Sequence, residues 1–582
     1  MWTFLKLAVF MLSNFGWWEF FRKKWNVGLY FIPIFTISVQ FTALFFFGLW
    51  NCLPYGAVLM YGTGILLAGW QVWKNRAKCF GPYCNWGIGF LVVLTLLAAV
   101  LLRDRMFAWQ DSYTHWGVVA NKILQADRFP NFTDAVIVFQ NYPLGAALYI
   151  YYFCRLTSSS EGMMMLAQTY MMLCMILPVF GFVKKNRVLA GISAALMTNF
   201  LLCYNIPITE LLVDTLLGLA GGCTLIFLAD QCNAAGEEHA EIRCLLAIPM
   251  LCFLSQIKNS AGLFVAAAIL VLLWQAKRQP KTDRYSTWAL VITILAPLAV
   301  MFLWDRHCDF SFADAAASKH ALSGDWMQMA YSEKTHADIV IILQRVVNYM
   351  VTRREAWGLL AFAAFLGIVW GVGKRPWKRY GKRLGLAAAL YAAYTVGLMG
   401  MYVFSMPRPA ALDVECIDRY AKTMDIAIYV LLFAWLLESL SCINRRQIAA
   451  GASGVLVLLS VVIWKDQLNL RCFWNLEEPS QIRMMANEMI DQYGVEKGYS
   501  YMLCRRGDQY DHPYFIMRYL MDSDDVQNVI VDAESDMAQE ENCDYILIFD
   551  ENNPIIAQWV QRKFPEQAGE RVIYSIKNAQ KE

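Results

Sequence analysis

The sequence is poor in charged residues. Of its 582 residues, 17% are Asp, Glu, Lys or Arg, whereas 58% are hydrophobic, and the mean hydropathy is +0.38. Soluble globular domains have about 25% charged residues, so this composition excludes an ordinary soluble domain. Many apolar runs approach the roughly 20 residues that cross a bilayer. We therefore predict an α-helical polytopic membrane protein.

Several motifs of soluble enzymes and pumps are also missing. The chain has no glycine-rich P-loop, no GxGxxG after a strand, no GxSxG and no HExxH, which disfavours nucleotide-driven pumps and soluble-type hydrolases. The 16 cysteines are scattered without CxxC pairs and the six histidines are dispersed, so we predict no disulfide and no zinc site. With a net charge of +3 and no basic domain, we expect no nucleic-acid partner.

Apolar stretches divide the chain into predicted spans and loops. The thirteen candidate spans are 28–49, 54–73, 86–102, 162–183, 188–204, 211–229, 244–257, 260–276, 286–304, 355–372, 384–404, 421–440 and 447–464. Residues 1–16 are a further, short span or an interfacial helix, because the basic cluster at 22–24 follows the apolar run, unlike in a signal peptide.

The distribution of Lys and Arg predicts the orientation of these spans. If residues 22–24 are cytoplasmic, alternation places six later loops on the same side: 74–78, 184–187, 230–243, 277–284, 373–383 and 444–447. All of them except 230–243, which is net acidic, are basic, as expected for cytoplasmic loops. This requires that the apolar segment after Tyr142 does not cross the membrane. The polar tail after residue 464 then lies outside. Its short strand-like and helix-like runs predict a small extracytoplasmic α/β domain at 465–582, following a transmembrane domain at 1–464.

The first outer loop, residues 103–142, holds the first dense group of ionisable side chains. Asp111 and His115 are four residues apart in a helix-compatible run, so we expect them to share a face. One interpretation is a general base, Asp111, oriented by His115. The other is a helix N-cap followed by an interfacial histidine.

Other predicted outer segments also carry chemistry-bearing residues. Glu210 and Asp214 repeat the four-residue spacing at the start of a span, as a second acidic contribution or as a solvated helix start. Lys258 either binds a phosphate or extends to the membrane interface. Arg419 either clamps a phosphate beside Tyr420 or pairs with a neighbouring carboxylate at a helix start.

The long outer loop, residues 305–350, contains three histidines. His307, His320 and His336 are separated by spacings that fit no zinc motif. We therefore predict a mobile, partly helical flap over the site instead of a metal centre.

The order of these features resembles that of bacterial GT-C-type integral-membrane glycosyltransferases, which use polyprenyl-phosphate-linked sugars. The resemblance rests on the acidic first outer loop (FAWQDSYTHW, 107–116), the Tyr-Pro-Leu-Gly at 142–145, the following spans with a long outer loop, and the late loop bearing Asp-Arg-Tyr at 418–420. It extends over most of residues 86–464, with a small extracytoplasmic domain after it.

The resemblance implies a mechanism. Asp111, with Asp104 as the fallback, would deprotonate an acceptor hydroxyl, which displaces the lipid phosphate at the anomeric carbon with inversion. The cations for the leaving phosphate would be Lys258, Arg408 and Arg419, and Trp109, Tyr113 and Trp116 would stack on the sugar. The other predicted substrate-binding residues are Tyr420 beside Arg419, His320 of the long outer loop, and the acidic residues Glu210 and Asp214.

The resemblance also implies the partners and the location. We expect a polyprenyl-phosphate-linked sugar as donor, contact with membrane lipid, and an extracytoplasmic acceptor such as a wall polymer, lipid glycan or protein. We expect no organic cofactor, with the need for a divalent cation left open, and a place in the bacterial plasma membrane. The alternatives are a transporter or flippase of lipid-linked sugars, and a wall-polymer ligase or polymerase of another fold.

Overall fold

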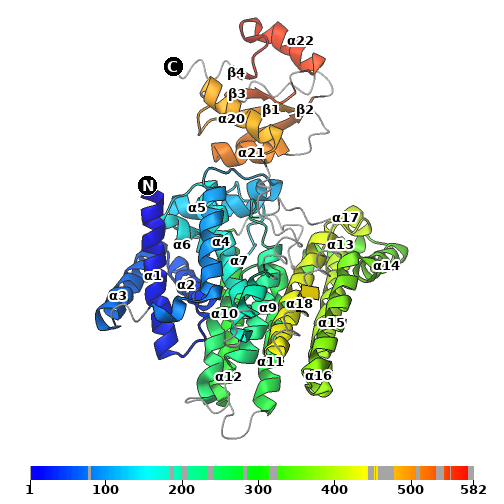
Figure 1. Cartoon of the computed structure of the whole chain (residues 1–582). Helices are drawn as coiled ribbons and strands as arrows, with labels where there is room; N and C mark the ends of the chain where they lie inside the picture. Colours follow the sequence, from blue (N-terminus) through cyan, green and yellow to red (C-terminus); the bar gives the residue numbers. More distant parts are fainter. Residues whose placement is uncertain are drawn as a thin grey trace.

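The computed structural model shows a helical body with a small α/β domain at one end (Figure 1). The structure describes residues 2–75, 80–183, 189–195, 197, 208–232, 240–278, 285–312, 324–443, 451, 454–455, 478–505, 512–531, 543–550 and 552–574.

The helical body contains long helices together with several short ones. Their bounds are α1 Trp2–Lys24, α2 Ile32–Leu49, α3 Leu53–Asn75, α4 Trp86–Leu102, α5 Gly117–Ala126, α6 Gly145–Leu156, α7 Glu161–Ile176, α9 Asp214–Asp230, α10 Ala247–Ser255, α11 Gly262–Arg278, α12 Thr287–Ser311, α13 Gly324–Ser332, α14 His336–Thr352, α15 Arg354–Val372, α16 Trp377–Phe404, α17 Arg408–Leu412 and α18 Ile417–Leu440.

Within the described residues, eight helical stretches are long and apolar enough to cross a membrane. They are Ile32–Leu49, Leu53–Lys74, Glu161–Phe182, Asn259–Arg278, Thr287–Ser311, Arg354–Val372, Trp377–Phe404 and Ile417–Leu440. The predicted spans at 188–204 and 447–464 lie largely outside the described residues. The chain therefore has the helix lengths and composition of a multi-pass membrane protein, as its sequence predicts.

The apolar segment after Tyr142 forms the short helix α6. Its 12 residues extend about 18 Å at 1.5 Å per residue, which is less than the roughly 30 Å of a bilayer core. Most of its side chains are buried, and they pack against α5, α7 and α2. A helix of this length cannot cross the membrane by itself, which is the condition that the predicted orientation needs.

Helices α9 and α18 form a tightly packed parallel pair in the body. A Cβ atom on Gly218 of α9 would lie 2.4 Å from the Thr423 carbonyl oxygen, and one on Gly222 would lie 2.9 Å from Cβ of Val430. Small residues of this kind let two membrane helices approach closely. One turn before Gly218, the same register places the first residue of α9, Asp214, opposite Arg419 of α18.

The C-terminal part folds into a small sheet with flanking helices. The strands are β1 Tyr501–Arg505, β2 Val526–Ile530, β3 Tyr545–Ile548 and β4 Val572–Tyr574, in the order β2-β1-β3-β4. Strand β1 is parallel to β2 and β3, and β4 is antiparallel to β3. Every residue of β1 is buried, as is typical of a central parallel strand. The helices are α20 Gln481–Tyr493, α21 His512–Met521 and α22 Pro554–Lys563.

Candidate functional site

Four segments that are far apart in the sequence meet in one ionic cluster, which we call the Asp111 cluster. It consists of Asp111, Asp214, Lys258 and Arg419. Arg419 Nη1 lies 2.8 Å from Asp111 Oδ2, and its Nη2 lies 3.1 Å from Asp214 Oδ2. Lys258 Nζ lies 2.6 Å from Asp214 Oδ1. The structure thus brings together candidates from the first outer loop, the start of α9, the segment before α11, and α18.

Asp111 is placed by an unusual turn of helix. The five residues Ser112–Trp116 form the π-helix η3, in which the Gly117 amide donates to the Ser112 carbonyl oxygen. Asp111 precedes η3, and its side chain makes no capping hydrogen bond. It binds Arg419 instead, so the N-cap interpretation does not describe this carboxylate. Single π turns occur frequently at functional sites.

His115 is packed among aromatic rings, and its buried Nδ1 has no hydrogen-bond partner among the described residues. Its ring lies 4.6 Å from the Trp116 ring and 4.9 Å from the Tyr142 ring, between centroids, and the residue is buried. Burial lowers the pKa of His115 from 6.5 to about 3. The predicted pairing with Asp111 is not among the contacts of the described residues, in which Asp111 binds Arg419 and the His115 ring contacts Trp116 and Tyr142.

The two carboxylates of the Asp111 cluster have different environments. Asp214 is 10% exposed, and its two oxygens accept from Lys258 and Arg419. Asp111 is 38% exposed, and among the described residues its Oδ1 has no hydrogen-bond partner. Asp214 therefore holds the two cations in place, whereas Asp111 presents an accessible carboxylate oxygen.

The two cations keep donors for a ligand. Arg419 uses Nη1 and Nη2 on the carboxylates, and within the described part of the chain its buried Nε has no hydrogen-bond partner. Lys258 donates one hydrogen bond to Asp214, and an ammonium group carries three N–H donors. Its Nζ also lies 5.0 Å from the ring centroid of Tyr420. Together they offer positive charge and free N–H groups, which is what an anionic oxygen needs.

The loop before α6 positions both Lys258 and the aromatic edge of the cluster. The Gly145 amide donates to the Gln256 carbonyl oxygen at 2.6 Å, and a Cβ on Gly145 would lie 2.4 Å from that oxygen. Only glycine permits this approach, which fixes the segment carrying Lys258. Tyr142, three residues earlier, is a site residue that the sequence did not single out. Burial, then nearby Tyr420 and Asp214, raise the pKa of its hydroxyl, so it stays protonated.

The predicted aromatic residues differ in accessibility. Trp109 is exposed, while Tyr113 and Trp116 are buried. The Tyr113 hydroxyl donates to the Phe107 carbonyl oxygen, and the Trp116 ring packs against His115. Of the three, only Trp109 presents a large open ring surface.

Other predicted residues lie apart from the Asp111 cluster. Asp104 has an 88% exposed side chain, 3.7 Å from Arg103. Arg408 forms a two-pronged pair with Asp338 of α14 at 2.9 and 3.1 Å, and with Thr335 it holds the pKa of Asp338 well below its usual range. His320 lies outside the described residues.

Glu210 is buried but is not on a helix. Helix α9 begins at Asp214, so the helical spacing that the sequence predicts between Glu210 and Asp214 is not formed. Gln168 of α7 donates to the carbonyl oxygens of Glu210 and Leu212. These two bonds hold the extended chain that leads into Asp214.

The predicted flap is largely helical where it is described. Helix α12 continues to Ser311, and α13 and α14 follow after residue 323. His307 Nε2 lies 3.0 Å from the Pro130 carbonyl oxygen, and Trp304 Nε1 donates to the Asn141 carbonyl oxygen at 3.3 Å. The end of α12 therefore packs against the first outer loop.

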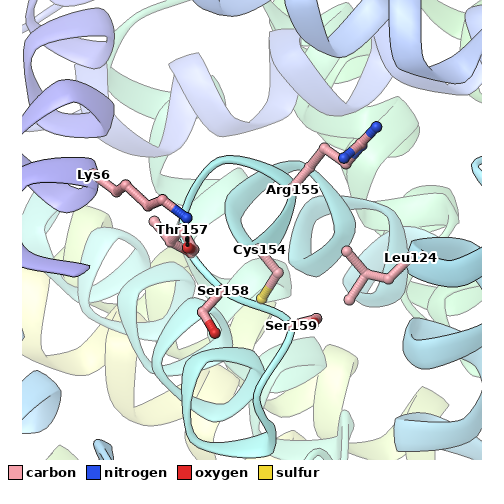
Figure 2. Close-up of a pocket in the computed structure, with 7 residues that line it drawn as sticks. All are labelled: Lys6, Leu124, Cys154, Arg155, Thr157, Ser158 and Ser159. Atoms are coloured by element: carbon pink, nitrogen blue, oxygen red, sulfur yellow. Dashed lines mark hydrogen bonds between the residues drawn. The ribbon is translucent and has the colours of Figure 1, made fainter. Parts of the chain in front are cut away.

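A polar pocket of about 430 Å³ lies apart from the Asp111 cluster and is lined by residues of α1, α5, α6 and the segment after α6 (Figure 2). Lys6 Nζ donates to the Thr157 carbonyl oxygen at 3.0 Å, and Ser158 and Ser159 also line the pocket. Arg155 points away from Lys6 and pairs with Asp127 at 3.0 Å. The pocket thus lacks the converging cations of the Asp111 cluster.

In the described part of the chain, no group of three or more His, Cys, Asp or Glu side chains is arranged to hold a metal ion. No protein-family model matches this chain, and neither a curated protein nor a solved structure is significantly similar to it.

Proposed function

We propose that the protein is an integral-membrane glycosyltransferase of the GT-C type, which transfers a sugar from a polyprenyl phosphate to an extracytoplasmic acceptor. The observation that carries the proposal is the Asp111 cluster, in which one accessible carboxylate lies beside two cations that retain free donors. Displacement at an anomeric carbon needs both parts, a base for the incoming hydroxyl and positive charge for the departing phosphate.

In this mechanism Asp111 is the general base. Its open carboxylate oxygen takes the proton of the acceptor hydroxyl, whose oxygen attacks the anomeric carbon as the bond to the phosphate oxygen breaks. The sugar is transferred with inversion, because a single displacement occurs. The polyprenyl phosphate leaves with the electron pair of that bond.

Lys258 and Arg419 stabilise the phosphate as it departs. The Arg419 Nε–H and the remaining Lys258 N–H groups are the donors that the carboxylates leave unused. Asp214 holds these two cations in position but binds no substrate, since both of its oxygens are already paired with them. Trp109, the exposed ring of the loop, is the proposed surface on which a sugar stacks.

The proposed topology follows the sequence. About thirteen spans place the Asp111 cluster and the C-terminal domain on the extracytoplasmic side of a bacterial plasma membrane. There the activated donor has to come from lipid instead of from a cytosolic nucleotide sugar.

The test is transfer of a radiolabelled sugar from synthetic polyprenyl-phosphate sugars by the purified full chain in lipid nanodiscs. Asp111→Asn should lower the transfer rate by 10²- to 10⁴-fold, the usual contribution of a general base. Asp104→Asn is the matched control, because it makes the same change in the same loop at an exposed position outside the cluster.

Two results would overturn the proposal. If Asp111→Asn keeps full activity, or if Asp104→Asn is the variant that loses it, the base is wrongly assigned. If the wild-type protein moves the lipid-linked sugar across sealed vesicles without forming a covalent product, the protein is a flippase.

A further inference from the structure

The C-terminal domain contacts the first outer loop directly, through α20 and α21 (Figure 1). Polar contacts join the C-terminal domain to the helical body. Among the described residues they include Arg483 with Glu161 at 2.9 Å, Lys122 with Asp522 at 2.6 Å, Arg105 with Glu478 at 2.6 Å, Arg518 Nη2 with the Ala135 carbonyl oxygen at 2.8 Å, and Asn487 Nδ2 with Met106 Sδ at 3.1 Å.

Arg483 of α20 is the buried centre of this interface. Its guanidinium carbon lies 5.3 Å from the ring centroid of Tyr113 and 5.8 Å from that of Tyr519 on α21. The two tyrosine rings meet edge to face at 5.5 Å. A guanidinium held between aromatic rings and a carboxylate is a geometry that lysine cannot reproduce.

The contacts of Arg483 form a closed network at the start of η3. Glu161, the first residue of α7, accepts from Arg483 with one oxygen and from the Phe107 amide with the other. The Phe107 carbonyl oxygen accepts from the Tyr113 hydroxyl, and the Tyr113 ring packs against the Arg483 guanidinium. Tyr113 is the second residue of η3, and Asp111 directly precedes η3.

We propose that Arg483 is a positioning residue, through which the C-terminal domain holds η3 so that Asp111 meets Arg419. This inference rests on the proposed role of Asp111 as the base. Arg483 does not contact the Asp111 cluster, so its effect passes through Tyr113 and η3. The C-terminal domain then supports the active site from outside it, through η3.

A positioning residue should change turnover more than donor binding. Arg483→Met should lower kcat roughly 10- to 100-fold, since a displacement of about 1 Å at a reacting group costs this much, while the KM for the donor stays within about two-fold. Arg483→Lys keeps the charge opposite Glu161 and should fall between the wild type and Arg483→Met. Arg562→Met, an exposed change on α22 of the same domain, is the control.

The experiment combines two readouts on the full chain in nanodiscs. The first is hydrogen–deuterium exchange of the peptide at 107–116, which should be faster in Arg483→Met and unchanged in Arg562→Met. The second is a double-mutant cycle. If Arg483 acts through Asp111, then Arg483→Met should cause no further loss of kcat in an Asp111→Asn background.

The outcomes separate this inference from the proposed function. Unchanged exchange at 107–116, or an additive loss in the double mutant, overturns the positioning role. A wild-type protein that transfers no sugar overturns the glycosyltransferase proposal, whatever the exchange shows. Faster exchange together with a non-additive loss supports the positioning role.

Discussion

Removing one partner of the buried ion pair between Arg353 and Asp425 should destabilise the helical body strongly. Arg353 Nη2 donates to Asp425 Oδ1 of α18 and to the Tyr391 hydroxyl of α16, at the junction of α14 and α15. The Arg353 side chain is 7% exposed and that of Asp425 is 0% exposed. One guanidinium thus joins elements that are separate in the sequence.

The magnitude follows from this burial. Deleting either partner leaves an uncompensated buried charge, which costs about 3–5 kcal/mol, whereas replacing both partners with apolar residues is near neutral. Arg353→Met and Asp425→Leu should therefore each lower the free energy of unfolding by about 3–5 kcal/mol. The double variant should recover most of that loss.

The assay is thermal unfolding of the purified protein in detergent, followed by intrinsic fluorescence and by size-exclusion chromatography. Arg345→Met is the matched control, because Arg345 and Asp413 form an exposed pair 3.6 Å apart, and exposed pairs contribute about 0–1 kcal/mol. The reasoning is refuted if the single variants melt like the control, or if the double variant is no more stable than the weaker single variant.

Three further predictions concern other polar groups. The pKa of His115 is about 3 in the folded state and 6.5 in the unfolded state. The free energy of unfolding therefore falls by up to about 1.4 kcal/mol per pH unit as the pH drops below 6.5. His115→Phe should reduce this pH dependence in melting curves recorded between about pH 5 and 7. Arg419→Lys should lower kcat/KM about 10- to 100-fold in steady-state assays, since one ammonium cannot bind both carboxylates as the guanidinium does. Arg408→Ala should leave the transfer rate unchanged, since its pair with Asp338 lies outside the cluster; a large loss of rate would place Arg408 back at the phosphate.

Composition and position in the chain made most members of the Asp111 cluster predictable as individual residues. Asp214, Lys258 and Arg419 stand out because ionisable side chains are rare beside apolar runs. Their convergence was not predictable, because it depends on the register of α9 against α18, which Gly218 and Gly222 allow. From the sequence alone, each of them could therefore equally have had a purely structural role at a helix end or at the membrane interface.

The structure also changed the roles of individual residues. A four-residue spacing predicted that Asp111 and His115 share a face, but in the structure Asp111 binds Arg419 and the His115 ring packs against Trp116 and Tyr142. The link from Arg483 to Glu161 joins residues 322 apart in the sequence, and no local pattern signals such a contact. The exposure that distinguishes Asp111 from Asp214 likewise depends on tertiary packing.

The most direct test of the central claim is an experimental structure of the full chain in nanodiscs with bound polyprenyl phosphate. We predict phosphate density within hydrogen-bond distance of Arg419 Nε and Lys258 Nζ, beside the open carboxylate of Asp111. Phosphate bound elsewhere, for example in the pocket between Lys6 and Arg155, with the Asp111 cluster empty, would contradict the account.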